Sequence, residues 1–384
     1  MKSVVAEPNG LPLSGIRVIE FSHMVMGPAC GMILADLGAE VIKVEPPEGD
    51  RTRSLPGLGR GFFRTFNRNK KSVTIDLQSA DGQAQARALL ATADVLLENF
   101  RPGLMASWGL DYGSLSHLYP GLIYVSHKGF LPGPYENRLA LDEVVQNMAG
   151  LTYMTGPVGM PLRAGSSVND IMGGMFGAIG VLAALRERER TGKGQEIQSA
   201  LFENCCLLMA QHLQQHLITG EPVPPLPSRT SAWGVYDVFT LAEGRQLFIG
   251  AVSDKQFQAL CEVLGRPDLG ADPAYAGNTA RVAERERLLP QLAANLEARE
   301  ATELIRALEA AGVPFAEVSR PEDLATDPHL LASGGLVPLQ TEDGDDTLTV
   351  LLPLLMAGRR PGVRSALPRA GEHNAEILGR LSQG

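Results

Sequence analysis

Cysteine and clustered positive charge are both scarce in this sequence. Its 384 residues include four cysteines, Cys30, Cys205, Cys206 and Cys261, and none of them has CxxC or metal-ligand spacing. The adjacent pair at 205–206 stands in an apolar run, which favours core packing in a reducing compartment over a disulfide framework. The formal net charge is −9, and no basic run is longer than a few residues. We therefore expect no nucleic-acid partner, because nucleic-acid surfaces need clustered lysine and arginine.

Metal motifs, hydrolase signatures and membrane-length apolar runs are also absent. The seven histidines form no HxH or HExxH pattern, so we expect no metal site. No G-x-S-x-G elbow marks an α/β-hydrolase. The longest nearly apolar stretch, residues 171–185, contains four glycines and is shorter than the roughly 20 residues of a membrane span. The first residues lack the apolar core of a secretory signal, so we expect a soluble, cytoplasmic protein that does not bind a membrane.

Short β-branched runs alternate with helix-like segments in the first third of the chain. Strand-like runs are 16–21, 40–45, 72–77, 95–97 and 122–126, and the segments 29–38 and 82–93 have helical spacing. A strand, a helix and a second strand within about 30 residues form a βαβ unit, which places the two strands in parallel. The repeated alternation predicts an α/β fold with a Rossmann-like open parallel sheet.

The alternation of strand-like and helix-like segments ends near residue 141, and longer helix-like segments follow. Helices are expected at 141–150, 170–190, 202–219, 254–264, 282–298, 301–311 and 372–381, with a hairpin at 236–240 and 246–251 and a strand pair within 348–356. Four prolines between 220 and 227 mark the clearest linker. We therefore predict a large domain made of residues 1–220 and 335–384, and a smaller α+β domain over 221–334.

The turn after the first strand lacks the glycine triplet of a dinucleotide site. It reads HMVMGPACG over 23–31, and Pro28 removes a backbone N–H that a pyrophosphate would need. NAD or FAD binding is therefore not expected. The later segment TGKGQ at 191–195 predicts a helix C-cap and a turn rather than a phosphate loop.

Asp170 opens an apolar helix and is followed by Gly173 and Gly174. A helix N-cap is the simpler interpretation. The paired glycines, however, weaken the helix that they begin and suit a site where a bulky group lies against the backbone. A carboxylate at a helix start is also favoured in its charged form, which would keep it nucleophilic, and nearby backbone N–H groups could stabilise an oxyanion. The residues alone leave the choice open.

Asn99, Phe100 and Arg101 follow a predicted strand directly. The carboxyl end of a strand in an open α/β sheet is where ligands usually bind, although a plain turn before Pro102 is an equal alternative. The basic residues Arg51, Arg53, Lys70 and Lys71 could meet phosphates or could be solvated surface charges.

Several segments together resemble the class III CoA-transferases of the CaiB/BaiF type, which include formyl-CoA transferase, carnitine CoA-transferase and the α-methylacyl-CoA racemases. The matching segments are LSGIRVIEF at 13–21, GP at 27–28, GAEVIKVE at 38–45, GDRTR at 49–53, NRNKKS at 67–72, ENFRPG at 98–103, SHKGF at 126–130, TGKGQ at 191–195 and GEHN at 371–374. They follow the order of the family along nearly the whole chain, which makes the resemblance specific.

The resemblance implies a large Rossmann-like domain that contains both termini, a smaller domain inserted late in the chain, and an interlocked homodimer. It places the nucleophile on Asp170, and it makes Asp142 a candidate for orienting the acceptor or polarising an intermediate, with a helix-start cap as the alternative. The expected CoA-binding residues are His23, Met24, Lys71, Asn99, Phe100, Arg101 and Lys128. No tightly bound cofactor is implied, because coenzyme A and acyl-CoA are substrates.

Departures from the family pattern narrow the expected reaction. The region 138–146 contains no histidine, which disfavours an α-methylacyl-CoA racemase or epimerase, because that reaction needs a second acid/base group. Leu141, Asp142 and Pro46 replace residues of formyl-CoA transferase, which makes formyl or oxalate substrates doubtful. The stretch 140–156 is most similar to the branch that acts on succinyl-CoA and C4–C5 dicarboxylates.

We therefore expect transfer of CoA from succinyl-CoA to glutarate, itaconate or mesaconate, through an aspartyl anhydride and an aspartyl-CoA thioester on Asp170. The far carboxylate of such an acceptor needs a cation, and Arg51, Arg163 and Arg229 are the candidates. A racemase, a non-catalytic CoA-binding paralogue and a nicotinamide-dependent oxidoreductase are the competing hypotheses.

Overall fold

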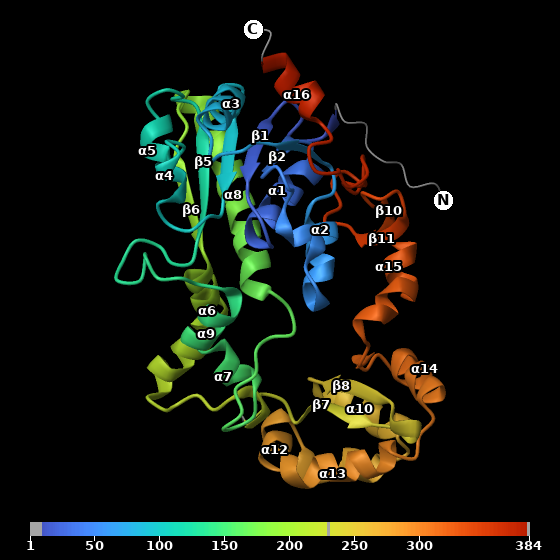
Figure 1. The fold of residues 1–384 in the computed structure, drawn as a ribbon. Helices are drawn as coiled ribbons and strands as arrows, with labels where there is room; N and C mark the ends of the chain where they lie inside the picture. The colour runs from blue at the N-terminus through green and yellow to red at the C-terminus, as the bar shows by residue number, and fades with distance from the viewer. Residues whose placement is uncertain (1–9, 229–230, 382–384) are drawn as a thin grey trace. The chain divides into compact units, whose positions relative to one another are not determined.

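The computed structural model describes residues 10–228 and 231–381 (Figure 1). The chain divides into two compact units, one formed by residues up to Pro227 together with those from Ala325 onward, and one formed by Ser228–Leu324. The division at 227/228 follows the proline-rich linker, whereas the sequence places the boundaries at 220/221 and 334/335. Residues 1–9, on which the expectation about a secretory signal rests, and Arg229 lie outside the described residues.

The first unit is built on a six-stranded sheet in the order β3-β2-β1-β4-β5-β6. Its strands are β1 Arg17–Phe21, β2 Glu40–Glu45, β3 Lys70–Thr74, β4 Val95–Glu98, β5 Ile123–Lys128 and β6 Glu196–Ala200. Every neighbouring pair in this sheet is parallel. This order is that of a doubly wound Rossmann sheet, and it reverses between β1 and β4. The predicted α/β class is confirmed.

Helices cover both faces of this sheet (Figure 1). Alternate residues of β1 point to opposite sides: Val18 packs in a cluster with α1 and α8, whereas Ile19 and Phe21 pack in a cluster with α3, α4, α5 and α16. These helices are α1 Met26–Asp36, α3 Ala80–Leu90, α4 Leu104–Ser107, α5 Tyr112–Leu115, α8 Val168–Thr191 and α16 Asn374–Leu381. The strands are therefore buried on both faces, as a parallel sheet requires.

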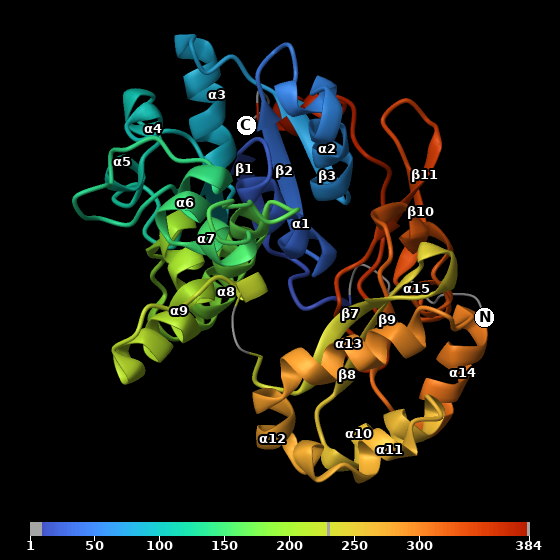
Figure 2. The ribbon, with the colours of Figure 1, turned by 90° about the horizontal axis from the view of Figure 1, so that it is seen from below.

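A second group of elements surrounds the start of α8, where α6, α7 and α9 pack together (Figure 2). The remaining elements of this unit are α2 Arg60–Phe66, α6 Asp142–Met148, α7 Leu151–Thr155, α9 Leu201–Thr219, α15 Pro328–Ala332, β10 Leu336–Gln340 and β11 Asp346–Val350. The expected helices 170–190 and 202–219 are confirmed to within two residues at each end.

The tail differs from its prediction. The expected strand pair within 348–356 is wrong, because β11 ends at Val350 and pairs instead with the earlier strand β10. The turn between them contains Gly344 with φ +91°, a left-handed conformation that glycine adopts readily. An Asp-Gly pair between two alternating runs is the hairpin signal that gives this arrangement.

The second unit is a three-stranded antiparallel sheet with helices, as expected for an α+β unit. Its elements are β7 Val235–Thr240, β8 Gln246–Ala251, α10 Asp254–Val263, α11 Pro267–Ala271, α12 Asn278–Ala283, α13 Arg285–Leu296, α14 Ala301–Ala311 and β9 Phe315–Glu317. The predicted β7–β8 hairpin is confirmed. The single helix expected over 282–298 is instead two helices that meet at Glu284.

Candidate active site

Close contact between α8 and α1 explains the glycines that follow Asp170. A Cβ atom at Gly174 would lie 2.7 Å from the Cβ of Ala29 and 2.8 Å from the carbonyl oxygen of Met26. Gly173 and Gly177 are similarly crowded, by Met26 and by His127. The bulky group that lies against this backbone is therefore helix α1, and the crossing places the first turn of α8 beside the loop that precedes α1.

That loop and the loop after β4 together carry four of the expected CoA-binding residues. Because β1 and β4 are neighbours, the loops at their carboxyl ends lie side by side. The Nδ2 of Asn99 donates to the carbonyl of His23 at 2.8 Å, and the N–H of His23 donates to Oδ1 of Asn99 at 3.0 Å. The rings of His23 and Phe100 are 5.7 Å apart, and the side chain of Met24 is exposed next to them. This cluster lies where the strand order reverses, which is the usual ligand position in such sheets.

Arg101 and Lys128 line a neighbouring open pocket of about 380 Å³ between the ends of β4 and β5 and helices α4 and α5. The ammonium of Lys128 is 2.8 Å from the buried carboxylate of Glu98, which also accepts the N–H of Phe100 at 2.8 Å. Glu98 therefore binds both the loop after β4, through the N–H of Phe100, and the pocket cation Lys128. Sequence alone gives no signal for the role of Glu98, because its partners are set by strand pairing.

The structure does not bring Lys71 to this cluster. Its ammonium lies 2.9 Å from Glu40 and 2.7 Å from Glu376, on the face of the sheet that α16 covers. Alternation along β3 sends the preceding residue, Lys70, to the opposite face, where it pairs with buried Glu20. In this structure Lys71 therefore forms ion pairs with Glu40 and with Glu376 of the C-terminal helix, away from the residues around His23.

Asp142 caps helix α8 from outside that helix. Its Oδ2 accepts the backbone N–H groups of Asn169 at 2.9 Å and Asp170 at 3.1 Å, and its Oδ1 accepts the side-chain amides of Gln146 and Asn169. The side chain of Asp142 is buried, and both of its oxygens are occupied. Asp142 therefore binds the backbone at Asp170, and in this structure both of its oxygens accept hydrogen bonds from the network at the start of α8.

Asp170 itself is not the helix cap, because it stands third in α8 and its carboxylate makes no side-chain cap bond. The first four N–H groups of α8 already have acceptors. Those of Val168 and Ile171 donate to backbone carbonyls, and the two between them donate to Asp142. The expected oxyanion donors at this helix start are therefore occupied. Among the described residues, the Asp170 carboxylate accepts no hydrogen bond.

Burial, together with the nearby negative charges of Asp142 and Glu143, raises the pKa of Asp170 to about 7. The expectation that the helix start favours the charged form is therefore wrong, because desolvation and two like charges outweigh the helix dipole. A carboxyl group with this pKa changes charge near neutral pH. When ionised it is a more basic nucleophile than an ordinary aspartate.

Two of the three candidate arginines can be placed. Arg163 is exposed and forms an ion pair with Glu143, and the next residue, Ala164, donates its N–H to Gln146 at 2.8 Å. Arg163 is therefore tied to the network that caps α8, whereas Arg51 stands on the loop after β2. In the described ranges 10–228 and 231–381, no cluster of three His, Cys, Asp or Glu side chains could hold a metal ion.

The chain belongs to CoA-transferase family III, whose sequence profile matches residues 13–374. It is 37% identical over 383 residues to the succinate–glutarate CoA-transferase of Agrobacterium fabrum, covering 96% of each chain. It is 35% identical over 376 residues to the succinyl-CoA–D-citramalate CoA-transferase of Chloroflexus aurantiacus, covering 96% of this chain and 93% of that one. The crystal structure of a CAIB/BAIF family protein from Brucella suis matches with a TM-score of 0.87 at 33% identity, over 97% of this chain and 99% of that chain.

These matches confirm the resemblance inferred from the sequence motifs, and the protein is a class III CoA-transferase. Its substrates are therefore CoA thioesters and carboxylic acids.

Proposed function

We propose that this enzyme transfers CoA from succinyl-CoA to a C4–C5 dicarboxylate such as glutarate, itaconate or mesaconate, with Asp170 as the nucleophile. The observation that carries the proposal is that two carboxylates at the start of α8 differ in their hydrogen bonding. Asp142 accepts the backbone N–H groups at the start of α8, whereas the carboxylate of Asp170 accepts no hydrogen bond among the described residues and is desolvated. The residue after it, Ile171, packs against Val25 of the loop that carries His23. The names of the two relatives support the choice of donor and the size of the acceptor.

The reaction begins when a carboxylate oxygen of Asp170 attacks the thioester carbonyl of succinyl-CoA. The C–S bond breaks, which leaves a succinyl-aspartyl anhydride and a bound CoA thiolate. The thiolate then attacks the aspartyl carbonyl, which releases succinate and forms an aspartyl-CoA thioester. The acceptor carboxylate attacks that thioester and expels the thiolate, which finally attacks the acceptor carbonyl of the new anhydride. This last step gives the product thioester and regenerates Asp170.

The surroundings of Asp170 suit this chemistry in two ways. Desolvation raises the basicity of the carboxylate, and it also keeps water from an anhydride that would otherwise hydrolyse. The cap from Asp142 fixes the backbone at Asp170, so that the nucleophile does not move as its charge changes. Arg163 is the cation that we assign to the far carboxylate of the acceptor, because it is tied to the same network through Glu143.

We also propose that the enzyme is an interlocked cytoplasmic homodimer. Helix α8 is apolar on all sides over residues 171–185, and in the described part of the chain it is the one helix long and apolar enough to suit a membrane span. Its inner face packs on α1 and β5, but an outer stripe remains exposed, formed by Met175, Phe176, Ile179 and Leu182. Helix α9 carries a similar exposed series, formed by Leu207, Leu208, Leu213, Leu217 and Ile218. A second copy of the chain would cover this surface.

The direct test is mass spectrometry of the acyl-CoA products formed from succinyl-CoA and a panel of acids that includes glutarate, itaconate, mesaconate and oxalate. We expect a new dicarboxylyl-CoA with the wild type and none with Asp170→Ala. A racemase would instead incorporate solvent deuterium into an α-methylacyl-CoA without transfer. A non-catalytic paralogue would bind CoA and give no product with any acid. Either result would overturn the proposal.

A further inference from the structure

The turn that carries His23 and Met24 is held in an unfavourable backbone conformation. Met24 has φ +63°, in the left-handed region that non-glycine residues seldom occupy. The polar backbone groups around it are bound by side chains from neighbouring elements and not by the turn itself. The carbonyl of Ser22 accepts Nζ of Lys43 at 2.6 Å, Asn99 binds both the N–H and the carbonyl of His23, and the N–H of Met24 donates to Oγ1 of Thr52 at 3.1 Å.

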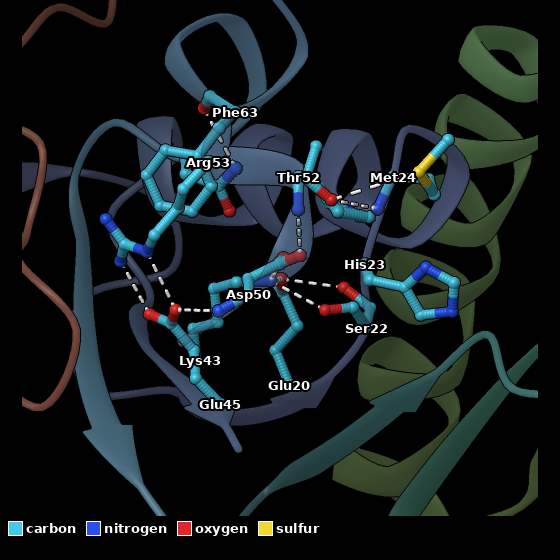
Figure 3. Close-up of polar contacts among 12 residues, drawn as sticks. Glu20, Ser22, His23, Met24, Lys43, Glu45, Asp50, Thr52, Arg53 and Phe63 are labelled. Carbon is cyan, nitrogen blue, oxygen red and sulfur yellow. Dashed lines mark hydrogen bonds and ion pairs between the residues drawn. The ribbon is translucent and has the colours of Figure 1, made fainter. Parts of the chain in front are cut away.

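The side chain of Thr52 contacts both the backbone and the side chain of Met24, as Figure 3 shows. The Thr52 hydroxyl accepts the Met24 N–H and lies 3.9 Å from the Met24 sulfur, toward which it can donate its own hydrogen. Thr52 is buried, with a relative exposure of 2%, whereas His23 and Met24 are exposed. The turn therefore shows its side chains to the surface while a buried hydroxyl fixes its backbone.

The position of Thr52 is itself fixed by buried charge. It lies in the short 3-10 turn Arg51–Ser54, and its N–H donates to Oδ1 of Asp50 at 2.8 Å. The other oxygen of Asp50 is 2.9 Å from Nζ of Lys43, whose side chain is completely buried. Since Lys43 also holds the carbonyl of Ser22, the three residues Lys43, Asp50 and Thr52 form one connection between the loop after β2 and the loop after β1 (Figure 3). We call this connection the Met24 latch.

We infer that Thr52, supported by Asp50, is a positioning residue for acyl-CoA binding: the latch keeps Met24 left-handed and so presents His23 and Met24 to the CoA moiety. The inference rests on the proposed function, which gives this loop its ligand. Without the Thr52 hydroxyl, the Met24 N–H loses its partner, and the residue can relax to an ordinary negative φ. The neighbouring side chains would then leave the positions that the latch sets.

The test compares Thr52→Val, which keeps the shape and loses the hydroxyl, with Thr52→Ser, which keeps the hydroxyl. The matched control is Thr65→Val, because the hydroxyl of Thr65 is exposed and donates within α2 to the carbonyl of Gly61. For each variant, calorimetry gives the Kd of CoA, steady-state assays give kcat and both KM values, and thermal melts give Tm.

We expect Thr52→Val to raise the Kd of CoA and the KM of the acyl-CoA donor about tenfold, the order of effect of losing one hydrogen bond that orders the binding loop. The KM of the acceptor acid and the Tm should change little, Thr52→Ser should restore CoA affinity, and Thr65→Val should behave as the wild type. If Thr52→Val does not fold, Thr52→Cys replaces it with the same expectation, because a thiol is a weak acceptor.

An unchanged Kd in the variant without the hydroxyl, or an equal loss in Thr52→Ser, would overturn the inference. A rise in the KM of both substrates together with a large fall in Tm would also overturn it, because that pattern indicates a general structural role. Calorimetry needs no turnover, so these outcomes are distinct from failure of the proposed function, which would appear as no dicarboxylyl-CoA from the wild type.

Discussion

At the scale of single residues, Asp142 and Asp170 show how two carboxylates of one site can have different tasks. The oxygens of Asp142 are filled by N–H donors, and its charge acts on Asp170 through space. Burial and this like charge raise the pKa of Asp170 to about 7. The fraction of Asp170 that is ionised therefore rises as the pH passes through about 7, and under the proposed mechanism the pH dependence of the reaction reports on its neighbours.

We predict that kcat/KM rises with pH through an apparent pKa near 7, because only ionised Asp170 attacks the thioester. In Asp142→Asn, the like charge is gone while one oxygen can still accept the helix N–H groups, so the acid limb should move to lower pH. Measuring kcat/KM between about pH 5 and 9 for both proteins checks this. An unmoved limb in Asp142→Asn, or a limb that moves to higher pH, would contradict this assignment.

Little of this residue-level arrangement could be predicted from sequence. The Asn99–Phe100 pair and Asp170 follow from family motifs. The structure places Asn99 against His23 at the carboxyl end of the sheet, and it packs Ile171, the neighbour of Asp170, against Val25 of the same loop. The cap from Asp142 could not be anticipated, since it joins residues 27 positions apart through side-chain geometry. For Lys71, the motif gave no information about which face of β3 the ammonium would take.

At the scale of elements, the crossing of α1 and α8 fixes where Asp170 stands. Gly174 lies at this crossing with no room for a side chain, because both Ala29 and the Met26 carbonyl are within 3 Å of an added Cβ atom. Long, strongly patterned elements such as α8 and α9 were predicted to within two residues. Strand β6, with the sequence EIQSA, was not predicted, because its short and polar run is stabilised mainly by pairing with β5.

We predict that Gly174→Ala destabilises the fold by about 1–3 kcal/mol and lowers transfer activity, because the helices must separate to admit a methyl group. Gly379→Ala in α16 is the matched control, since a Cβ atom there meets nothing within 4 Å, and it should stabilise by about 0.5–1 kcal/mol. Urea unfolding of both variants measures the difference. Equal stability of the two variants would show that the crossing tolerates the extra atom.

At the scale of the whole molecule, the exposed stripe on α8 is the feature that a single chain leaves unexplained. A helix that is apolar on all sides is normally covered on all sides. The length and hydropathy of α8 match a membrane span, but its first turn carries Asp170 and its inner face packs on the sheet. The proposed second copy would cover the exposed stripe and leave the inner face on the sheet.

We predict that the purified enzyme has twice the 41.1 kDa mass of the chain in light scattering after gel filtration. Ile179→Lys places a charge in the exposed stripe and should shift the population toward the monomer. Leu118→Lys is the control, because Leu118 is also exposed but lies outside α8 and α9. A monomeric wild type, or equal effects of the two substitutions, would argue against this interface.

The most direct test of Asp170 as the nucleophile is to trap the covalent intermediate. The enzyme is incubated with succinyl-CoA and quenched with hydroxylamine, which converts an aspartyl anhydride or thioester into a hydroxamate, and the digest is analysed by peptide mass spectrometry. We predict a hydroxamate on Asp170 in the wild type, dependent on succinyl-CoA and absent from Asp170→Asn. Transfer that proceeds while the Asp170 peptide stays unmodified, or a hydroxamate on another carboxylate, would contradict it.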